Sequence, residues 1–81
     1  MVEKARRLAR TIMADINLYS PQKVEASIRE NSFFTVFASE LREGKKLYDN
    51  RIPPDVRSQG DFFREAVENF IEGKKKTLGI N

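Results

Sequence analysis

The sequence predicts a small all-α protein, a bundle of three longer helices and one short connector helix that is completed by dimerisation. Three observations lead to this prediction. Apolar residues recur at alternating steps of three and four along most of the chain, which is the spacing of an amphipathic helix. No strand-length stretch alternates apolar and polar residues. The 81 residues suit one domain near the size at which a single core leaves little stability to spare, so burial between subunits is expected to add to it.

The clearest periodicity lies in the first quarter of the chain. Apolar residues from Ala5 to Ile16 stand three or four positions apart, and basic side chains occupy the opposite side of the predicted helix. We expect a first helix over about residues 1–18. It should end before Ser20 because the residue that precedes a proline is pushed out of helical geometry. Ser20 then suits the N-cap of the next helix, and Pro21 suits its first position.

Turn-forming residues divide the middle of the chain into two further helices. A short connector helix is expected over residues 21–29, where the apolar face is thin. A longer helix is expected over residues 33–49, after the cap-type pair Asn31-Ser32. Gly44 lies on the inner face of that helix. Either another helix approaches closely at this point, or the glycine is merely tolerated there.

The last third of the chain begins with two prolines, which end the preceding helix. We expect one final helix over residues 54–73 that continues through Gly60, because its apolar residues keep helical spacing across the glycine. The alternative is a short turn followed by a helix that Asp61 caps. Residues 74–81 are predicted to form a frayed or partner-dependent tail.

Composition excludes several classes of function. The chain has no cysteine and no histidine, which excludes disulfides, ordinary zinc sites and imidazole acid–base chemistry. Its carboxylates, such as Asp61 and Glu65, stand at helical spacing on a predicted solvated face, and its glycines are isolated. We therefore expect no enzymatic activity, catalytic residue, cofactor, metal or small-molecule substrate. Neither a membrane span nor a signal peptide is visible, so a cytoplasmic protein with no membrane partner is expected.

The aromatic residues favour self-association as the function. Six of the eight aromatic side chains are phenylalanines, and neighbours in a helix point about 100° apart. A chain this short is expected to leave some of them uncovered, unless the short helix covers the surplus. Exposed aromatic patches mark interfaces, and the two-fold dimer is the commonest assembly. We therefore expect an oligomerisation or protein-interaction module that binds a second copy or other domains of a parent protein. The candidate interface residues are Ile12, Ile16, Phe33, Phe34, Phe37, Phe62 and Phe63.

Two basic clusters suggest a second function, weak and sequence-nonspecific binding of nucleic acid. The net charge of +3 is modest for such a protein. A helix-turn-helix is not supported, because the supposed recognition helix would begin with the apolar Phe33 and Phe34 where base contacts need polar residues. Contacts to phosphates are still possible along one helix. The candidate contact residues are Arg6, Arg7, Arg10, Lys74, Lys75 and Lys76.

Several short segments resemble a known module. They are Ala5–Arg10, Asp15–Tyr19, Lys23-Val24, Leu47-Tyr48, Arg51, Val56-Arg57 and Asp61–Phe63. Together they resemble a small all-helical module of environmental bacteria, without established activity, that is associated with the C-terminal ends of zinc-ribbon and other regulatory proteins. The resemblance implies an accessory segment attached to a domain that does something else, and it transfers no catalytic or binding residue.

Overall fold

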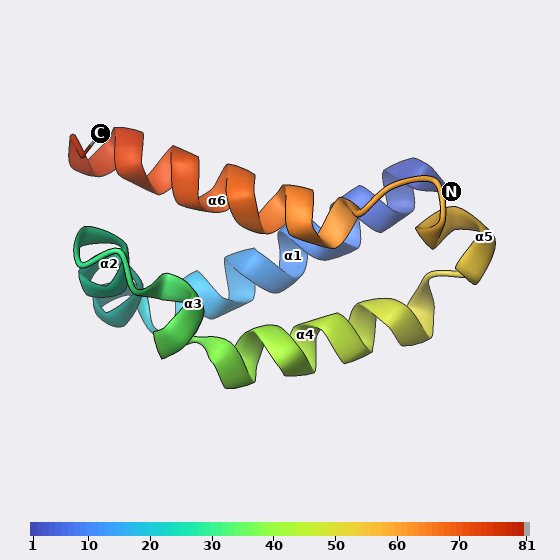
Figure 1. The fold of residues 1–81 in the computed structure, drawn as a ribbon, viewed down its shortest axis with the longest axis horizontal. Coiled ribbons are helices and arrows are strands. Elements are labelled where there is room, and N and C mark those ends of the chain that lie inside the picture. The colour runs from blue at the N-terminus through green and yellow to red at the C-terminus, as the bar shows by residue number, and fades with distance from the viewer. Residues whose placement is uncertain (81) are drawn as a thin grey trace.

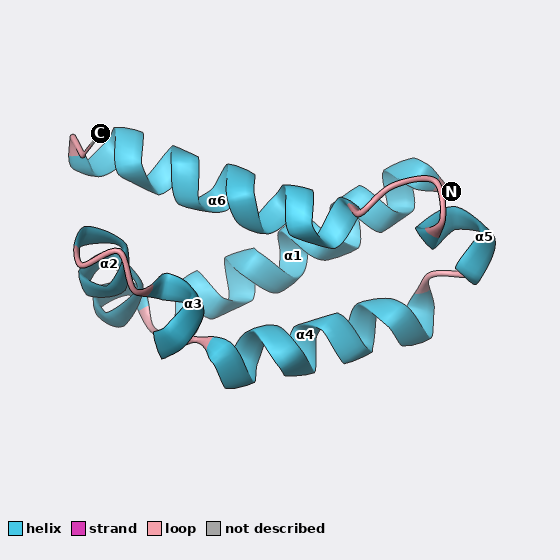
Figure 2. Ribbon diagram, viewed as in Figure 1, coloured by secondary structure: helices cyan, strands magenta, loops and turns pink. Residues whose placement is uncertain are grey.

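The first helix, α1 (Val2–Tyr19), is the element on which most of the others pack. The computed structural model describes residues 1–80. One side of α1 is buried from Ala5 to Ile16, and its basic side is exposed. It packs most extensively against α6 (Phe62–Leu78) and also contacts α2 (Pro21–Arg29), α4 (Ala38–Arg51) and α5 (Pro54–Arg57). Short loops join the helices (Figure 2). In chain order the helices of the described residues are α1 (Val2–Tyr19), α2 (Pro21–Arg29), α3 (Phe33–Val36), α4 (Ala38–Arg51), α5 (Pro54–Arg57) and α6 (Phe62–Leu78).

The prediction of an all-α protein is confirmed, and the bounds of α1 and α2 agree with the sequence pattern to within one or two residues. Figure 1 shows α6 and α4 lying side by side in projection with α1 behind them, while α2 and α3 close one end and α5 the other. The molecule measures 37 × 22 × 18 Å along its principal axes. Within residues 1–80, no helix combines the length and the apolar character that crossing a membrane requires.

The helix predicted over residues 33–49 is wrong in its continuity. The chain bends at Phe37, which separates the single turn α3 from α4. Phe33 and Phe37 both lie in the core, where their ring centroids are 5.0 Å apart, and Phe33 also packs against Phe70. Helix α4 then continues past residue 49. It ends at Arg51, and the next residue, Ile52, takes an extended conformation because a proline follows it.

The helix predicted over residues 54–73 is likewise wrong, and the alternative that the sequence left open is the one observed. The chain forms the single turn α5, breaks at Gly60, and starts α6 after Asp61. The Asp61 carboxylate accepts a hydrogen bond from the backbone N–H of Arg64 at 3.1 Å, which satisfies one of the unpaired donors of the first turn. Capping at this point outweighs helical continuity through the glycine.

The predicted frayed tail is wrong for residues 74–78, which form the last part of α6. Gly79 ends the helix in a left-handed conformation with φ of 71°, which glycine adopts at little cost. The N–H of Ile80 donates to the carbonyl of Lys75 at 2.8 Å and closes the last turn. Lysines in that turn also interact favourably with the negative end of the helix dipole. Residue 81 lies outside the described part of the chain.

A single copy buries more of its aromatic surface than the sequence suggests. Phe62 and Phe63 are both buried because α6 meets a different neighbour on each side. The guanidinium carbon of Arg6, on α1, lies 5.1 Å from the centroid of the Phe62 ring. On the other side, the ring centroids of Phe63 and of Tyr48, on α4, are 5.6 Å apart. Of the residues expected to need a partner, six are buried within the monomer: Ile12, Ile16, Phe33, Phe37, Phe62 and Phe63. The exception is Phe34, which is 60% exposed.

Gly44 marks the point where α1, α4 and α6 meet. A Cβ atom at this position would lie 2.7 Å from Cγ2 of Ile12 and 3.5 Å from Cζ of Phe63. The first distance is shorter than real Cβ contacts allow, so Ile12 or the helices that carry the two residues would have to shift. Of the two explanations that the sequence offered for Gly44, close packing is therefore the one the structure supports.

Gly44→Ala is expected to destabilise the protein by about 1–2 kcal/mol, although alanine is the better helix former. Overpacking a core costs about 1–3 kcal/mol, and Ile12 is β-branched and cannot turn aside freely. The measurement is the free energy of unfolding from urea denaturation. Gly73→Ala is the matched control, since apart from its own turn of helix no atom of residues 1–80 lies within 4 Å of a Cβ there, and it should stabilise α6 by about 0.5–1 kcal/mol. Equal gains in both variants would contradict the packing account of Gly44.

Candidate interaction groove

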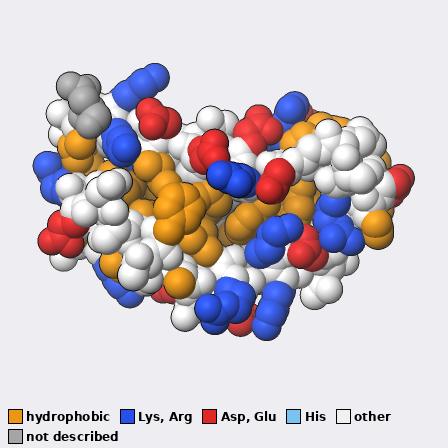
Figure 3. Space-filling model, viewed as in Figure 1, with side chains coloured by type: hydrophobic (Ala, Val, Ile, Leu, Met, Phe, Trp, Pro, Cys, Tyr) orange, Lys and Arg blue, Asp and Glu red, His pale blue; other side chains and the backbone are white. Residues whose placement is uncertain are grey.

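An open apolar groove runs between α6 on one side and α3 and α4 on the other. It has a volume of about 630 Å³. Figure 3 shows hydrophobic side chains gathered in this region at the centre of the exposed face. We call it the α4–α6 groove. It is lined by Phe34, Leu41, Lys45, Asp61, Phe63, Arg64, Val67, Glu68, Ile71 and Glu72.

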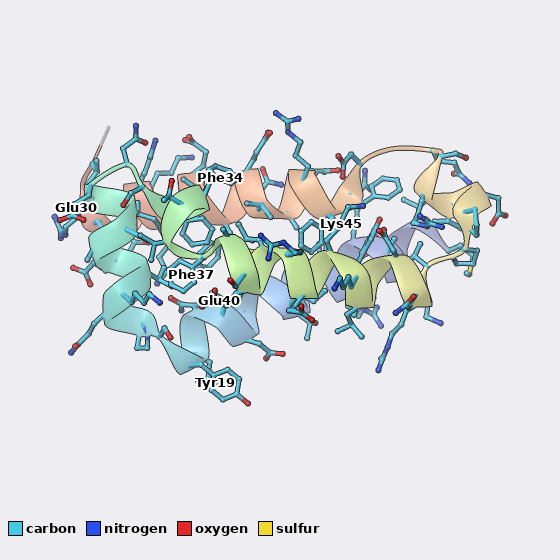
Figure 4. All side chains as sticks on the ribbon, turned by 60° about the horizontal axis from the view of Figure 1, so that its bottom comes forward. Tyr19, Glu30, Phe34, Phe37, Glu40 and Lys45 are labelled. Atoms are coloured by element: carbon cyan, nitrogen blue, oxygen red, sulfur yellow. The ribbon has the colours of Figure 1, made fainter. Side chains whose placement is uncertain are left out.

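Phe34 stands at the rim of the groove because its neighbour Phe33 occupies the core. Phe33 points into the core from the single turn α3, and its neighbour is directed about 100° away. The two rings meet edge to face with centroids 6.0 Å apart. Figure 4 shows Phe34 on α3 and Lys45 on α4, both on the side of these helices that faces α6. A phenylalanine that is 60% exposed beside partly buried Leu41 and Ile71 is a feature of a docking surface.

Charged side chains of α6 border the groove in a regular row. Arg64, Glu68 and Glu72 are four residues apart and therefore share one face of the helix. The Nε atom of Arg64 lies 2.9 Å from Oε1 of Glu68. The sequence analysis missed these residues, together with Leu41, Val67 and Ile71. The i, i+4, i+8 spacing of charges beside Val67 and Ile71 is the signal that could have indicated a bordered apolar face.

The other interface candidates from α1 line a second hollow on a different side. Ile12 and Ile16 lie between α1 and α4, in a hollow of about 350 Å³ that has acidic residues at its edge. Tyr19, at the end of α1, projects away from the body of the molecule (Figure 4) and is 83% exposed. These residues do not join the α4–α6 groove, so the structure does not bring the predicted interface residues together in one surface.

Of the basic residues predicted to contact nucleic acid, Arg6 and Arg10 interact with side chains of this chain, and the lysines lie far from them along α6. Arg6 stacks on Phe62 and its Nε atom lies 3.8 Å from Oε2 of Glu65, while Arg10 pairs with Glu3 at 3.3 Å. Helices α1 and α6 run in the same direction (Figure 1). The lysine run at residues 74–76 therefore lies about 15 Å further along α6 than Glu65 does, at about 1.5 Å per residue. Arg7, which follows Arg6 on α1, is exposed. The basic clusters do not form one continuous patch at the level of Arg6, and nucleic-acid binding stays a prediction.

A polar hollow of about 520 Å³ lies between α4 and the α5–α6 connection. Tyr48 lines it and is only 2% exposed. Its hydroxyl finds no hydrogen-bond partner within residues 1–80. Burial raises the pKa of this hydroxyl above its ordinary value of about 10, and the charges of Asp61 and Asp49 raise it further, while Arg57 acts in the opposite direction.

Comparison with known proteins gives no match, since no protein-family model fits the chain and no curated protein or solved structure is significantly similar to it. The resemblance to a bacterial helical module therefore stays a prediction. Within the part of the chain that the structure describes, no three acidic side chains are grouped so that they could hold a metal ion.

Tyr48→Phe is expected to raise the free energy of unfolding by about 1 kcal/mol at neutral pH, because a buried hydroxyl without a partner costs about 1–3 kcal/mol. It should also change the dependence on pH. The raised pKa means that the folded state holds the phenolic proton more tightly than the unfolded state. Stability is therefore intact below pH about 10 and falls as pH rises through the folded-state pKa.

The measurement is urea denaturation of the wild type and the variant at several pH values from neutral to alkaline. Tyr19→Phe is the matched control because Tyr19, the other tyrosine of the chain, is exposed. The alkaline loss of stability should shrink in Tyr48→Phe and persist in Tyr19→Phe. Superimposable curves for wild type and Tyr48→Phe would show that the buried hydroxyl has no such role.

Proposed function

We propose that the protein is a non-enzymatic self-association module, and that a second copy of the chain covers the α4–α6 groove. The observation that supports this proposal best is the position of Phe34. It is a large apolar side chain, 60% exposed, at the rim of an apolar groove. The monomer buries its other phenylalanines wholly or in part. Phe34 is therefore the phenylalanine whose burial would require a second molecule.

Two-fold symmetry doubles the apolar surface that association buries. Fully burying a phenylalanine side chain contributes about 1.5–3 kcal/mol, which alone does not offset the loss of translational and rotational freedom on association. In a two-fold dimer the same surface is used twice, so both copies of Phe34 and both grooves are buried in one event. Leu41, Val67 and Ile71 provide the apolar floor on which a partner ring can pack. A second copy is thus a suitable occupant, since it brings a matching apolar face.

The charge distribution supports a protein partner over a nucleic acid. Arg64, Glu68 and Glu72 at the edge of the groove include both signs, whereas phosphate binding requires an excess of positive charge. Both signs around an apolar centre are typical of protein interfaces, where a polar rim surrounds a drier core. The proposal assigns no catalytic role to these residues.

Phe34→Glu is expected to convert the dimer to a monomer, because it buries a charge against the apolar groove of the second copy. Light scattering coupled to gel filtration at micromolar concentration should give about twice the 9.4 kDa chain mass for the wild type and the single-chain mass for the variant. The folded state should be retained, since Phe34 is exposed in the monomer. Phe63→Glu is a poorer test because Phe63 is buried in the monomer core.

Leu18→Glu is the matched control. Leu18 is apolar and 72% exposed, but it does not line the α4–α6 groove, so this variant should remain dimeric. A wild-type chain that stays monomeric throughout the micromolar range would contradict the proposed function. Dissociation by Leu18→Glu with no effect of Phe34→Glu would place the interface on α1 and contradict the role of the groove.

A further inference from the structure

The row of charges on α6 contains information about the orientation of a second copy. Starting at the helix N-terminus, the side chains that border the groove are negative at Asp61, positive at Arg64, and negative at Glu68 and Glu72. Figure 3 shows acidic and basic side chains close together over α6, directly beside the apolar patch. Any partner helix that covers the groove must lie next to this row.

A parallel pairing of α6 with α6 of a second copy is unfavourable. In register, it places Arg64 opposite Arg64, Glu68 opposite Glu68 and Glu72 opposite Glu72. Like charges that face each other across an interface cost several kcal/mol in unfavourable cases. The apolar residues of the groove would still be buried, but the charges beside them would oppose the association at three levels of the helix.

An antiparallel pairing reverses the row and matches it. With the two-fold axis near residues 66–68, Arg64 of each copy lies opposite Glu68 or Glu72 of the other. These pairs form twice because the operation is symmetric. Lys75, near the C-terminal end of α6, is brought towards Asp61 of the other copy when the axis is at residue 68. At that position of the axis one like pair remains, Glu68 with Glu68, and each of these carboxylates already has Arg64 of its own chain at 2.9 Å.

We infer that two copies associate through α6 in antiparallel orientation, with the α4–α6 grooves facing each other and the oppositely charged rows of α6 side by side. This inference rests on the proposed self-association and adds its geometry. Helices α4 and α6 of both copies form the inner layers of the assembly, like the facing helix pairs of a four-helix bundle. Phe34 of each copy inserts into the shared apolar centre, and α1 lies on the outside.

Single cysteines provide a direct test of the orientation, because the chain has no cysteine of its own and every thiol cross-link is then between copies. Glu68→Cys places the thiol near the two-fold axis, so a short bismaleimide should convert most of the protein to a covalent dimer. Lys76→Cys is the matched control on the same helix. Its two thiols would lie on the order of 24 Å or more apart, at about 1.5 Å for each of the 16 or more residues between them, and should not be joined.

The outcomes separate the inference from the proposed function. Cross-linking of both variants indicates a parallel pairing and overturns the inference. Cross-linking of neither, in a protein that light scattering shows to be dimeric, places α6 away from the interface, which overturns the inference but not self-association. A monomeric wild type removes both. Only efficient cross-linking of Glu68→Cys together with none of Lys76→Cys supports the antiparallel arrangement.

Two variants with opposite charges on α6 test whether the row of charges contributes to association. Arg64→Glu makes the row wholly acidic, and the double variant Glu68→Arg with Glu72→Arg makes it basic at every position except Asp61. Each variant alone should dimerise at least about tenfold more weakly than the wild type, since like charges then face each other. An equimolar mixture should form a heterodimer, detectable by native mass spectrometry, and added salt should reduce the preference. Homodimers of both variants as strong as those of the wild type would show that the row does not contribute.

Discussion

The close approach at Gly44 is the constraint on which the arrangement of the long helices depends. With no side chain on this residue, α4 can lie against Ile12 of α1 and leave room for the ring of Phe63 from α6. Helix α4 is thereby held against α1, and it meets α6 where the ring of Tyr48 packs against that of Phe63. The α4–α6 groove opens between two helices that both pack on α1.

The sequence predicted the helical class and the first two helices well, since a strong apolar period and the Ser20-Pro21 boundary act locally. It failed at Phe37 and at Gly60 for a shared physical reason. At both places a continuous and a broken helix satisfy the apolar spacing equally, so periodicity cannot choose between them. The choice is made by interactions that depend on the fold, namely burial of the Phe33 ring beside Phe70, and by the local cap that Asp61 provides.

The candidate site could be predicted only in part, and Phe34 shows why. The sequence indicates that one member of the pair Phe33-Phe34 must point away from the other. It does not indicate which of the two enters the core, because the bend at Phe37 fixes the phase of α3. The remainder of the groove depends on how far α4 stands from α6, a relation between distant segments. Periodicity within one helix does not contain that relation, although the row from Arg64 to Glu72 could have shown that α6 has a bordered face.

The common direction of α1 and α6 has a consequence for anything joined to the chain. The start of α1 and the end of α6 lie at opposite ends of the longest dimension (Figure 1), which is 37 Å. Labels attached before Val2 and after Leu78 would therefore be held far apart by a stiff helical spacer. In an assembly with antiparallel α6 helices, each pole would display one label of each kind.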